Sequence, residues 1–203
     1  MMRAFFIWLS GSGAMRAVAE RSRVGQRMSA RFVAGTRIED AMRATRIMND
    51  LGLTVSIDSL GENVSNAEEA CASAAVYNRL LDEISRRGLA ANVSLKLTHM
   101  GLDIDENLAR ENVCALVAHA ARVHSFVRVD MEGSPYTERT LRLVRELHAA
   151  PGQDDAVGAV IQSYLYRSQK DVESLLADRI RIRLCKGAYK EPPEIAFQKK
   201  SEA

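Results

Sequence analysis

Short apolar segments rich in β-branched residues alternate with longer amphipathic segments along most of the chain. Each short segment is nearly continuously apolar where it begins and polar where it ends, which is typical of strands covered by helices. Their composition and length predict β-strands. The predicted strands cover residues 53–58, 92–97, 126–131, 157–164 and 180–186.

The longer segments show the apolar spacing and the end signals of α-helices. Capping boxes, in which Glu stands three residues after Ser or Thr, predict helix starts at Thr36 and Ser65, and glycines predict the ends at Gly52 and Gly88. Ser168 is expected to cap a short last helix. The apolar stripes are Ala70, Ala74, Tyr77, Leu81 and Ile84 in the second helix, Leu116, Val117, Ala120 and Val123 in the third, Leu141, Val144 and Leu147 in the fourth, and Val172, Leu175 and Leu176 in the fifth.

From residue 53 the order is a strand followed by a helix, repeated until a fifth strand. This alternation predicts a parallel sheet with right-handed crossovers, and strands recur about every 32 residues, the usual size of a βα repeat. Polar side chains end the strands: Asp58, Lys96, Asp130, Gln162 and Lys186. In a (β/α)8 barrel all strand ends meet at one mouth, whereas an open sheet gathers only those beside its switch point. The polar ends therefore favour an α/β fold of the TIM-barrel type.

Eight units of this size would extend to about residue 308, so 203 residues are expected to hold about five. We expect an N-terminal helical segment at residues 1–52 and a partial barrel at residues 53–203, with the last three units absent. A G-x-G sequence at residues 11–13 is typical of dinucleotide-binding turns, but Arg16 stands where the third glycine would be. A flexible turn is therefore the preferred interpretation of that segment.

The composition excludes several functional classes. With a net charge of +2 the chain has no basic tract, so nucleic acid is not an expected partner. The apolar run at residues 4–9 is too short to cross a bilayer. Cys71, Cys114 and Cys185 form no C-x-x-C pair and the histidines lack metal-binding spacing, so neither a disulfide framework nor a metal site is expected. We therefore expect a cytoplasmic protein.

Lys96 lies inside an apolar strand, where a buried ammonium needs a partner. It is interpreted as an anion-binding group or a Schiff-base nucleophile, and the alternative is a structural salt bridge with Asp58 or Asp130. Asp130 ends its strand and would orient a cation or tune a base at the mouth, or else stabilise a loop. Glu132 is expected to point away from Asp130 and to lie at the rim.

The last two strands add an amide and a basic segment. Gln162 both donates and accepts hydrogen bonds, which suits recognition of a heteroaromatic edge such as a flavin ring. Arg183 and Lys186, with Gly187 allowing close approach to the backbone, predict a site for an anion or a phosphate group. Cys185 is interpreted as a packed small hydrophobe rather than a nucleophile.

Six segments together resemble the proline dehydrogenase family in its bacterial monofunctional form, over essentially the whole chain. The stretches R-L-x-K-G-A-Y and V-x-V-D-M-E are the most specific. The six matching segments are FVAGTR, IDSLGENV, SLKLTHMGLDID, FVRVDMEGSPYT, VIQSYLYRSQKD and RLCKGAYKEPPEIAFQKK.

The resemblance implies a distorted (β/α)8 barrel that holds FAD non-covalently at its mouth. The implied reaction is the oxidation of L-proline to Δ1-pyrroline-5-carboxylate, with hydride passing from the ring carbon next to nitrogen to flavin N5. The implied partners are a membrane quinone as electron acceptor and a pyrroline-5-carboxylate dehydrogenase. A membrane quinone as acceptor implies that the protein lies peripherally at the inner membrane face.

The resemblance also implies roles for individual residues. Lys96 would hold the substrate carboxylate, and Asp130 and Arg183 would be catalytic, with Arg183 stabilising charge on the reduced flavin. The implied cofactor contacts are Met131, Gln162, Arg183, Lys186, Gly187, Ala188 and Tyr189.

Later family motifs, including the paired arginines that clamp the proline carboxylate, have no counterpart in these residues. A chain of this extent is therefore expected to be inactive alone. Two alternatives stay open: an aldolase-like barrel with Lys96 or Lys186 as the Schiff base, and a non-catalytic remnant.

Overall fold

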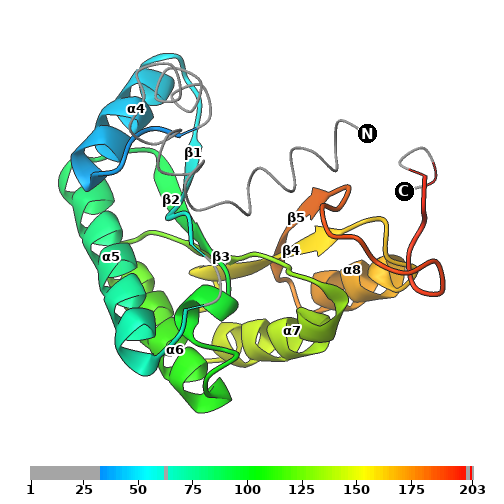
Figure 1. Ribbon diagram of the computed structural model, residues 1–203. Coiled ribbons are helices and arrows are strands. Elements are labelled where there is room, and N and C mark those ends of the chain that lie inside the picture. Colours follow the sequence, from blue (N-terminus) through cyan, green and yellow to red (C-terminus); the bar gives the residue numbers. More distant parts are fainter. Residues whose placement is uncertain (1–32, 62–63, 200–201, 203) are drawn as a thin grey trace, which may run out of the picture. The chain divides into compact units, whose positions relative to one another are not determined.

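The computed structural model describes residues 33–61, 64–199 and 202 (Figure 1). The chain divides into two units between Ile47 and Met48, and the first described element, helix α4 (Ile38–Asp50), crosses that boundary. It begins two residues after Thr36 and ends two residues before Gly52, inside the predicted helix. The G-x-G sequence and most of the predicted helical segment at residues 1–52 lie outside the described residues.

A parallel five-stranded sheet forms the centre of the second unit. Its strands follow one another in space in the order of the sequence, without the reversal that defines a doubly wound sheet. This is the order of a barrel, so the prediction of a partial barrel is confirmed at the level of the fold. The strands are β1 (Val55–Asp58), β2 (Ala91–Leu95), β3 (Val127–Val129), β4 (Val157–Gln162) and β5 (Arg181–Cys185).

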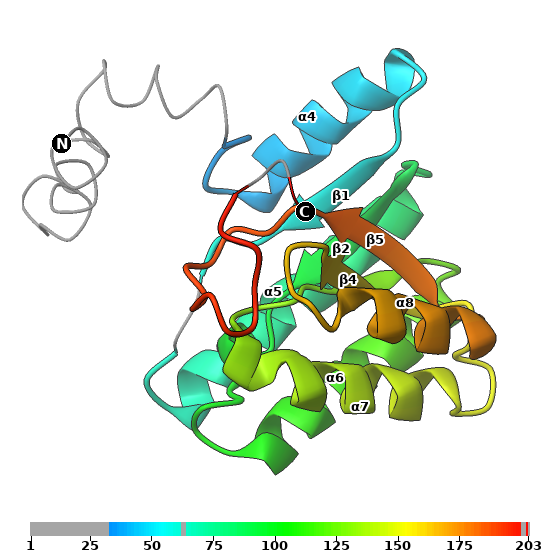
Figure 2. The ribbon, with the colours of Figure 1, turned by 90° about the vertical axis from the view of Figure 1, so that its right-hand side faces the viewer.

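Four helices pack on one face of this sheet, and each follows a strand (Figures 1 and 2). This placement is what right-handed crossovers between parallel strands produce. A 3-10 turn, η1 (Thr98–Met100), follows β2. The helices are α5 (Ala67–Arg86), α6 (Glu106–Arg122), α7 (Ser134–His148) and α8 (Ser168–Ala177).

The core lies between the helices and the sheet. Val93, Leu95 and Val129 point into it from the strands and are fully buried. Burying one such side chain contributes about 1.5–3 kcal/mol, so this layer supplies most of the stability. The predicted stripe of α5 is buried along its whole length, whereas the prediction for α8 is wrong at Leu176, which is 60% exposed.

Two predicted caps are displaced by one residue. Asn66 caps α5, since its side chain accepts a hydrogen bond from the Glu69 N–H at 2.9 Å, while Glu69 accepts one from the Ser65 N–H at 2.7 Å. Asn caps helices at least as well as Ser, which explains the shift. Ser168 is the first residue of α8 rather than its cap, and its hydroxyl donates to the Gln162 carbonyl oxygen at 2.6 Å.

Across the described residues, no helix combines the length and the apolar character needed to cross a bilayer.

Candidate active site

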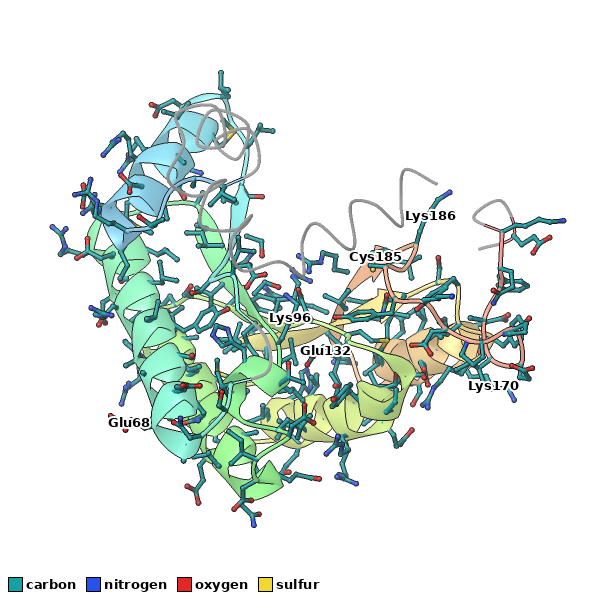
Figure 3. The ribbon with its side chains drawn as sticks, viewed as in Figure 1. Glu68, Lys96, Glu132, Lys170, Cys185 and Lys186 are labelled. Carbon is teal, nitrogen blue, oxygen red and sulfur yellow. The ribbon has the colours of Figure 1, made fainter. Side chains whose placement is uncertain are left out.

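The sheet face opposite the helices gathers polar side chains. In register, Asp58 lies beside Ser94, and Gln162 lies beside Cys185. Residues paired in this way point to the same face of a parallel sheet. Figure 3 shows Lys96 among the strands and Lys186 just after β5. The strand ends thus bring together residues that are far apart in the sequence.

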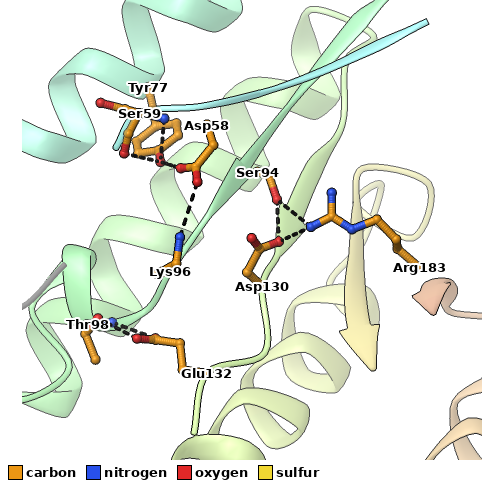
Figure 4. A network of polar contacts seen from close by, with 9 residues as sticks. All are labelled: Asp58, Ser59, Tyr77, Ser94, Lys96, Thr98, Asp130, Glu132 and Arg183. Atoms are coloured by element: carbon orange, nitrogen blue, oxygen red, sulfur yellow. Dashed lines mark hydrogen bonds and ion pairs between the residues drawn. The ribbon is translucent and has the colours of Figure 1, made fainter. Parts of the chain in front are cut away.

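Asp130 and Arg183 form the most specific contact on this face (Figure 4). Arg183 Nη2 lies 2.6 Å from Asp130 Oδ1 and 3.4 Å from the Ser94 hydroxyl oxygen, and that hydroxyl donates to the same carboxylate oxygen. The side chains of Arg183 and Asp130 are 40% and 18% exposed. The structure therefore brings the two predicted catalytic residues together and adds a serine that the sequence reasoning did not single out.

The contact also reveals the curvature of the sheet. Arg183 is on β5 and Ser94 is on β2, so two strands separate them. Three strand spacings in a flat sheet amount to about 14 Å, which an arginine and a serine cannot bridge. The strands must therefore curl around this face, with the polar side chains on the inside.

Burial dominates the electrostatics of Asp130 and raises the pKa of its carboxyl. The Ser94 hydrogen bond and the positive charges of Arg183 and Lys96 act in the opposite direction, and the negative charge of Asp58 adds to the effect of burial. Asp130 is thus a carboxyl whose charge depends on the partners that surround it.

Lys96 belongs to a second ion pair. Its Nζ lies 3.2 Å from Asp58 Oδ2, and the Tyr77 hydroxyl donates to Asp58 Oδ1 at 3.0 Å (Figure 4). Burial and the charge of Asp58 raise the pKa of Tyr77, which stays protonated as a donor. Asp58 stabilises the ammonium form of Lys96, whereas a Schiff-base nucleophile must be neutral. The salt-bridge alternative therefore describes the geometry of Lys96.

Glu132 does not lie at the rim, so that prediction is wrong. The residue is only 4% exposed, and its carboxylate accepts hydrogen bonds from the Thr98 N–H at 3.1 Å and the Thr98 hydroxyl at 2.6 Å. The reason is that residues two apart on a strand point to the same face, so alternation does not turn Glu132 away from Asp130, and β3 itself ends at Val129. Glu132 instead joins the end of β3 to η1.

Gln162 is buried, and its side-chain amide forms hydrogen bonds with the protein backbone. Its Nε2 donates to the carbonyl oxygens of Met131 at 3.2 Å and Glu132 at 3.0 Å, and its Oε1 accepts from the Ala188 N–H at 2.9 Å. The side chain thus ties the segment after β3 to the segment after β5. Met131 is buried as well.

The segment after β5 has a fixed backbone shape. Gly187 has a φ of +121°, and a Cβ atom there would lie 2.2 Å from Cδ1 of the Tyr164 ring. The Tyr164 N–H donates to the Lys186 carbonyl oxygen at 3.1 Å. Further along, the Glu191 carboxylate accepts from the N–H and the hydroxyl of Ser134, both at 2.7 Å, at the start of α7. These contacts hold the segment in one conformation.

The remaining predicted site residues lie in this same segment. Lys186 and Ala188 are exposed, and Tyr189 is half-buried. Sequence reasoning missed Ser94, although strand alternation places it on the face of Lys96 two residues later. It also missed Glu191, for which no local pattern gives a signal.

The chemistry of the face follows from these contacts. Of the three guanidinium nitrogens of Arg183, only Nη2 has a hydrogen-bond partner among the side chains that the structure describes. A guanidinium carries five N–H donors, so Arg183 retains donors for an anionic or electron-rich group at the mouth. A fixed cation of this kind stabilises negative charge that develops during a reaction.

Comparisons with known proteins identify a family for this chain. A family model described as Proline dehydrogenase matches residues 41–201. Proline dehydrogenase 1 of Bacillus subtilis (strain 168) is 35% identical over 201 residues, 98% of this chain, and Proline dehydrogenase of Deinococcus radiodurans is 35% identical over 199 residues, 93% of this chain. The chain spans about 65% of the length of these curated relatives.

More distant relatives include larger proteins. The Bifunctional protein PutA of Escherichia coli (strain K12) is 27% identical over 185 residues, 80% of this chain and 14% of that protein. A crystal structure of proline utilization A from Bdellovibrio bacteriovorus matches with a TM-score of 0.73 and 23% identity, and covers 81% of this chain and 20% of that one. The structural match supports the fold.

Proposed function

The chain belongs to the proline dehydrogenase family, and on that premise we propose that its residues serve the FAD-dependent oxidation of L-proline to Δ1-pyrroline-5-carboxylate. The observation that carries the proposal is the cluster of Ser94, Asp130 and Arg183 on the inner face of the sheet. It joins the two most specific family segments, V-x-V-D-M-E and R-L-x-K-G-A-Y, in a single contact.

The residues present fit a flavin. When bound, FAD supplies the acceptor for the hydride that leaves the ring carbon next to the proline nitrogen, while the amine N–H proton is lost and a C=N bond forms. The donors left on Arg183 suit the charge of a reduced flavin ring. The segment at Lys186, Gly187 and Ala188 is held in shape before any ligand arrives. Such pre-organisation lowers the entropic cost of binding.

Each residue then has a proposed task. Arg183 stabilises negative charge at the reacting centre, and Asp130 holds the guanidinium in place. Lys96 binds the substrate carboxylate, and its pairing with Asp58 keeps the ammonium charged and oriented. The proposed cofactor contacts are Met131, Gln162, Arg183, Lys186, Gly187, Ala188 and Tyr189.

Gln162 has a second proposed role. Because its amide already bonds to the backbone of both neighbouring segments, it sets the positions of Met131 and Ala188 as well as lying beside the cofactor. Its replacement would therefore disturb two binding segments together.

The proposal extends to partners and location. The likeness to a protein named bifunctional supports a pyrroline-5-carboxylate dehydrogenase as a partner that consumes the product. The proposed electron acceptor is a membrane quinone, and the proposed location is the cytoplasm, peripherally at the inner membrane face. These expectations come from the family alone.

The test compares Arg183→Ala with Arg181→Ala in the purified protein. Both arginines lie on β5, but Arg181 pairs with the exposed Asp155 at 2.9 Å and lies away from the cluster. In a chain extended by the remaining third of a curated relative, we expect the wild type and Arg181→Ala to bind FAD with visible absorbance and to reduce a dye with proline. Arg183→Ala should lose at least about 100-fold in turnover.

Equal turnover of Arg183→Ala and wild type would refute the assigned role of this arginine. Borohydride trapping of a carbonyl substrate on Lys96 or Lys186, with no flavin bound, would instead support the aldolase-like alternative. A chain that neither binds flavin nor traps a carbonyl compound would support the non-catalytic alternative.

A further inference from the structure

We propose that Ser94 is a positioning residue, whose hydroxyl fixes Asp130 and Arg183 relative to each other. The proposal rests on the proposed function, because it concerns the same reacting centre. It assigns a task to a residue that carries no charge and lies on a different strand from both partners.

The geometry allows only one arrangement of hydrogen bonds in the cluster (Figure 4). A guanidinium can only donate and an ionised carboxylate can only accept, whereas a hydroxyl does both. Arg183 Nη2 lies 3.4 Å from the Ser94 oxygen, so the hydroxyl hydrogen is left to point at Asp130 Oδ1. Ser94 therefore bridges the donor and the acceptor, and the hydrogen bond that it accepts from Arg183 polarises the one that it donates to Asp130.

The position of Ser94 shows that the hydroxyl, rather than the volume, is what the site requires. The residue is 2% exposed and is the last but one of β2. A buried hydroxyl destabilises a protein unless its hydrogen bonds compensate for the lost water, and alanine would fill nearly the same space without that cost. At Ser94 the compensating bonds go to the two proposed catalytic residues.

Ser56 provides a matched control on the neighbouring strand. It lies two residues before Asp58, which pairs in register with Ser94, so both serines share one face. Ser56 is exposed, and its hydroxyl donates to Asn92 Oδ1 at 2.8 Å, outside the cluster. Its replacement removes a hydroxyl from the same face without touching Asp130.

Several charged and titratable groups act on Asp130, and any test must keep them unchanged. Burial raises the pKa of Asp130, and the Ser94 hydrogen bond is the largest of the contributions that lower it. Removing only the hydroxyl should therefore make the carboxyl a weaker acid. The other groups that act on Asp130 are Arg183 and Cys185 from β5, Lys96 after β2, Asp58 from β1, Arg128 from β3 and Tyr77 from α5.

The experiment is a carbon-13 NMR titration of the Asp130 carboxyl in the whole chain. The variants are Ser94→Ala, Ser94→Cys, Ser94→Thr and Ser56→Ala. We expect the acid dissociation constant of Asp130 to fall about tenfold in Ser94→Ala, to fall by less in Ser94→Cys with its weak thiol donor, and to recover in Ser94→Thr. Ser56→Ala should match the wild type.

An unchanged Asp130 titration in Ser94→Ala would overturn the proposal, and an unchanged titration in Ser94→Cys would do so if the alanine variant does not fold. An equal fall in Ser94→Ala and Ser56→Ala would also overturn it, because the effect would then be general to the face. The titration needs no flavin and no turnover. The proposed function is judged separately, by flavin absorbance and by proline oxidation in Arg183→Ala.

Discussion

Replacing Gly187 with alanine tests whether the segment after β5 is a rigid binding element. The glycine has a φ of +121°, where residues with a side chain are strained, and the new methyl group would lie 2.2 Å from Cδ1 of Tyr164. The aromatic ring packs over this backbone, and the Tyr164 N–H bonds to the carbonyl oxygen of Lys186. The ring and the segment cannot both keep their positions.

The magnitude follows from two separate costs. Backbone strain at such a φ amounts to about 1–3 kcal/mol, and forcing a side chain out of a packed position costs about 1–3 kcal/mol more. If about 2 kcal/mol of this total destabilises the FAD-bound conformation relative to the free one, FAD binds about 30-fold more weakly. Replacing Tyr164 with alanine in the same chain removes the collision but leaves the strain, so the double variant should recover only part of the affinity.

The assay is a titration with FAD, followed by absorbance, together with urea unfolding of each variant. Gly152→Ala is the control, because Gly152 has a φ of +74° and no heavy atom within 4 Å of the added Cβ. That variant should lose about 1 kcal/mol of stability and keep its affinity for FAD. Wild-type affinity and stability in Gly187→Ala would refute the idea of a rigid segment.

Two further predictions concern the surroundings of the site and the general stability. Glu191→Ala should lower the free energy of unfolding in urea by about 1 kcal/mol, because it uncaps α7, whereas Glu194→Ala in the same exposed segment should change it by less than about 0.5 kcal/mol. Equal effects would show that the loss of charge, and not the cap, matters. Arg86 and Arg87 lower the pKa of Glu83 from 4.5 to about 2, so this carboxylate stabilises the fold above pH 4.5, and the stabilisation disappears as the pH falls to about 2. Thermal unfolding should therefore show a lower Tm for Glu83→Gln at pH 7 and no difference near pH 2; a difference independent of pH would contradict this.

The sequence pattern predicts the sheet better than it predicts the contacts across it. Alternation of apolar strands and amphipathic helices was enough to place all five strands and the helices between them. It could not show that Lys96 pairs with Asp58 and that Asp130 pairs with Arg183, because both carboxylates lie at strand ends near both cations. The choice depends on strand register and on curvature, which are set by packing over the whole sheet.

Local irregularity explains the other misses. The rim position expected for Glu132 depended on strand alternation away from Asp130, but residues two apart on a strand share a face, and beyond Val129 the chain turns toward Thr98. The cap of α5 moved from Ser65 to Asn66 because two adjacent residues can both cap a helix. A serine two residues before a lysine is by itself a weak sign of a functional residue. The role proposed for Ser94 follows only from its contacts with Asp130 and Arg183.

The two ion pairs together define what the inner face can bind. Each cation is matched by a carboxylate, so neither Lys96 nor Arg183 is a buried charge without compensation. In register Arg183 lies opposite Val160, and its guanidinium reaches across β4 to Asp130 on the far side, so the length of the side chain is essential. A lysine there would place its three donors on a single nitrogen, without the planar fork of five donors that Arg183 offers to Asp130, Ser94 and a ligand. The two ion pairs therefore support the proposed placement of the flavin at Arg183 and of the proline carboxylate at Lys96.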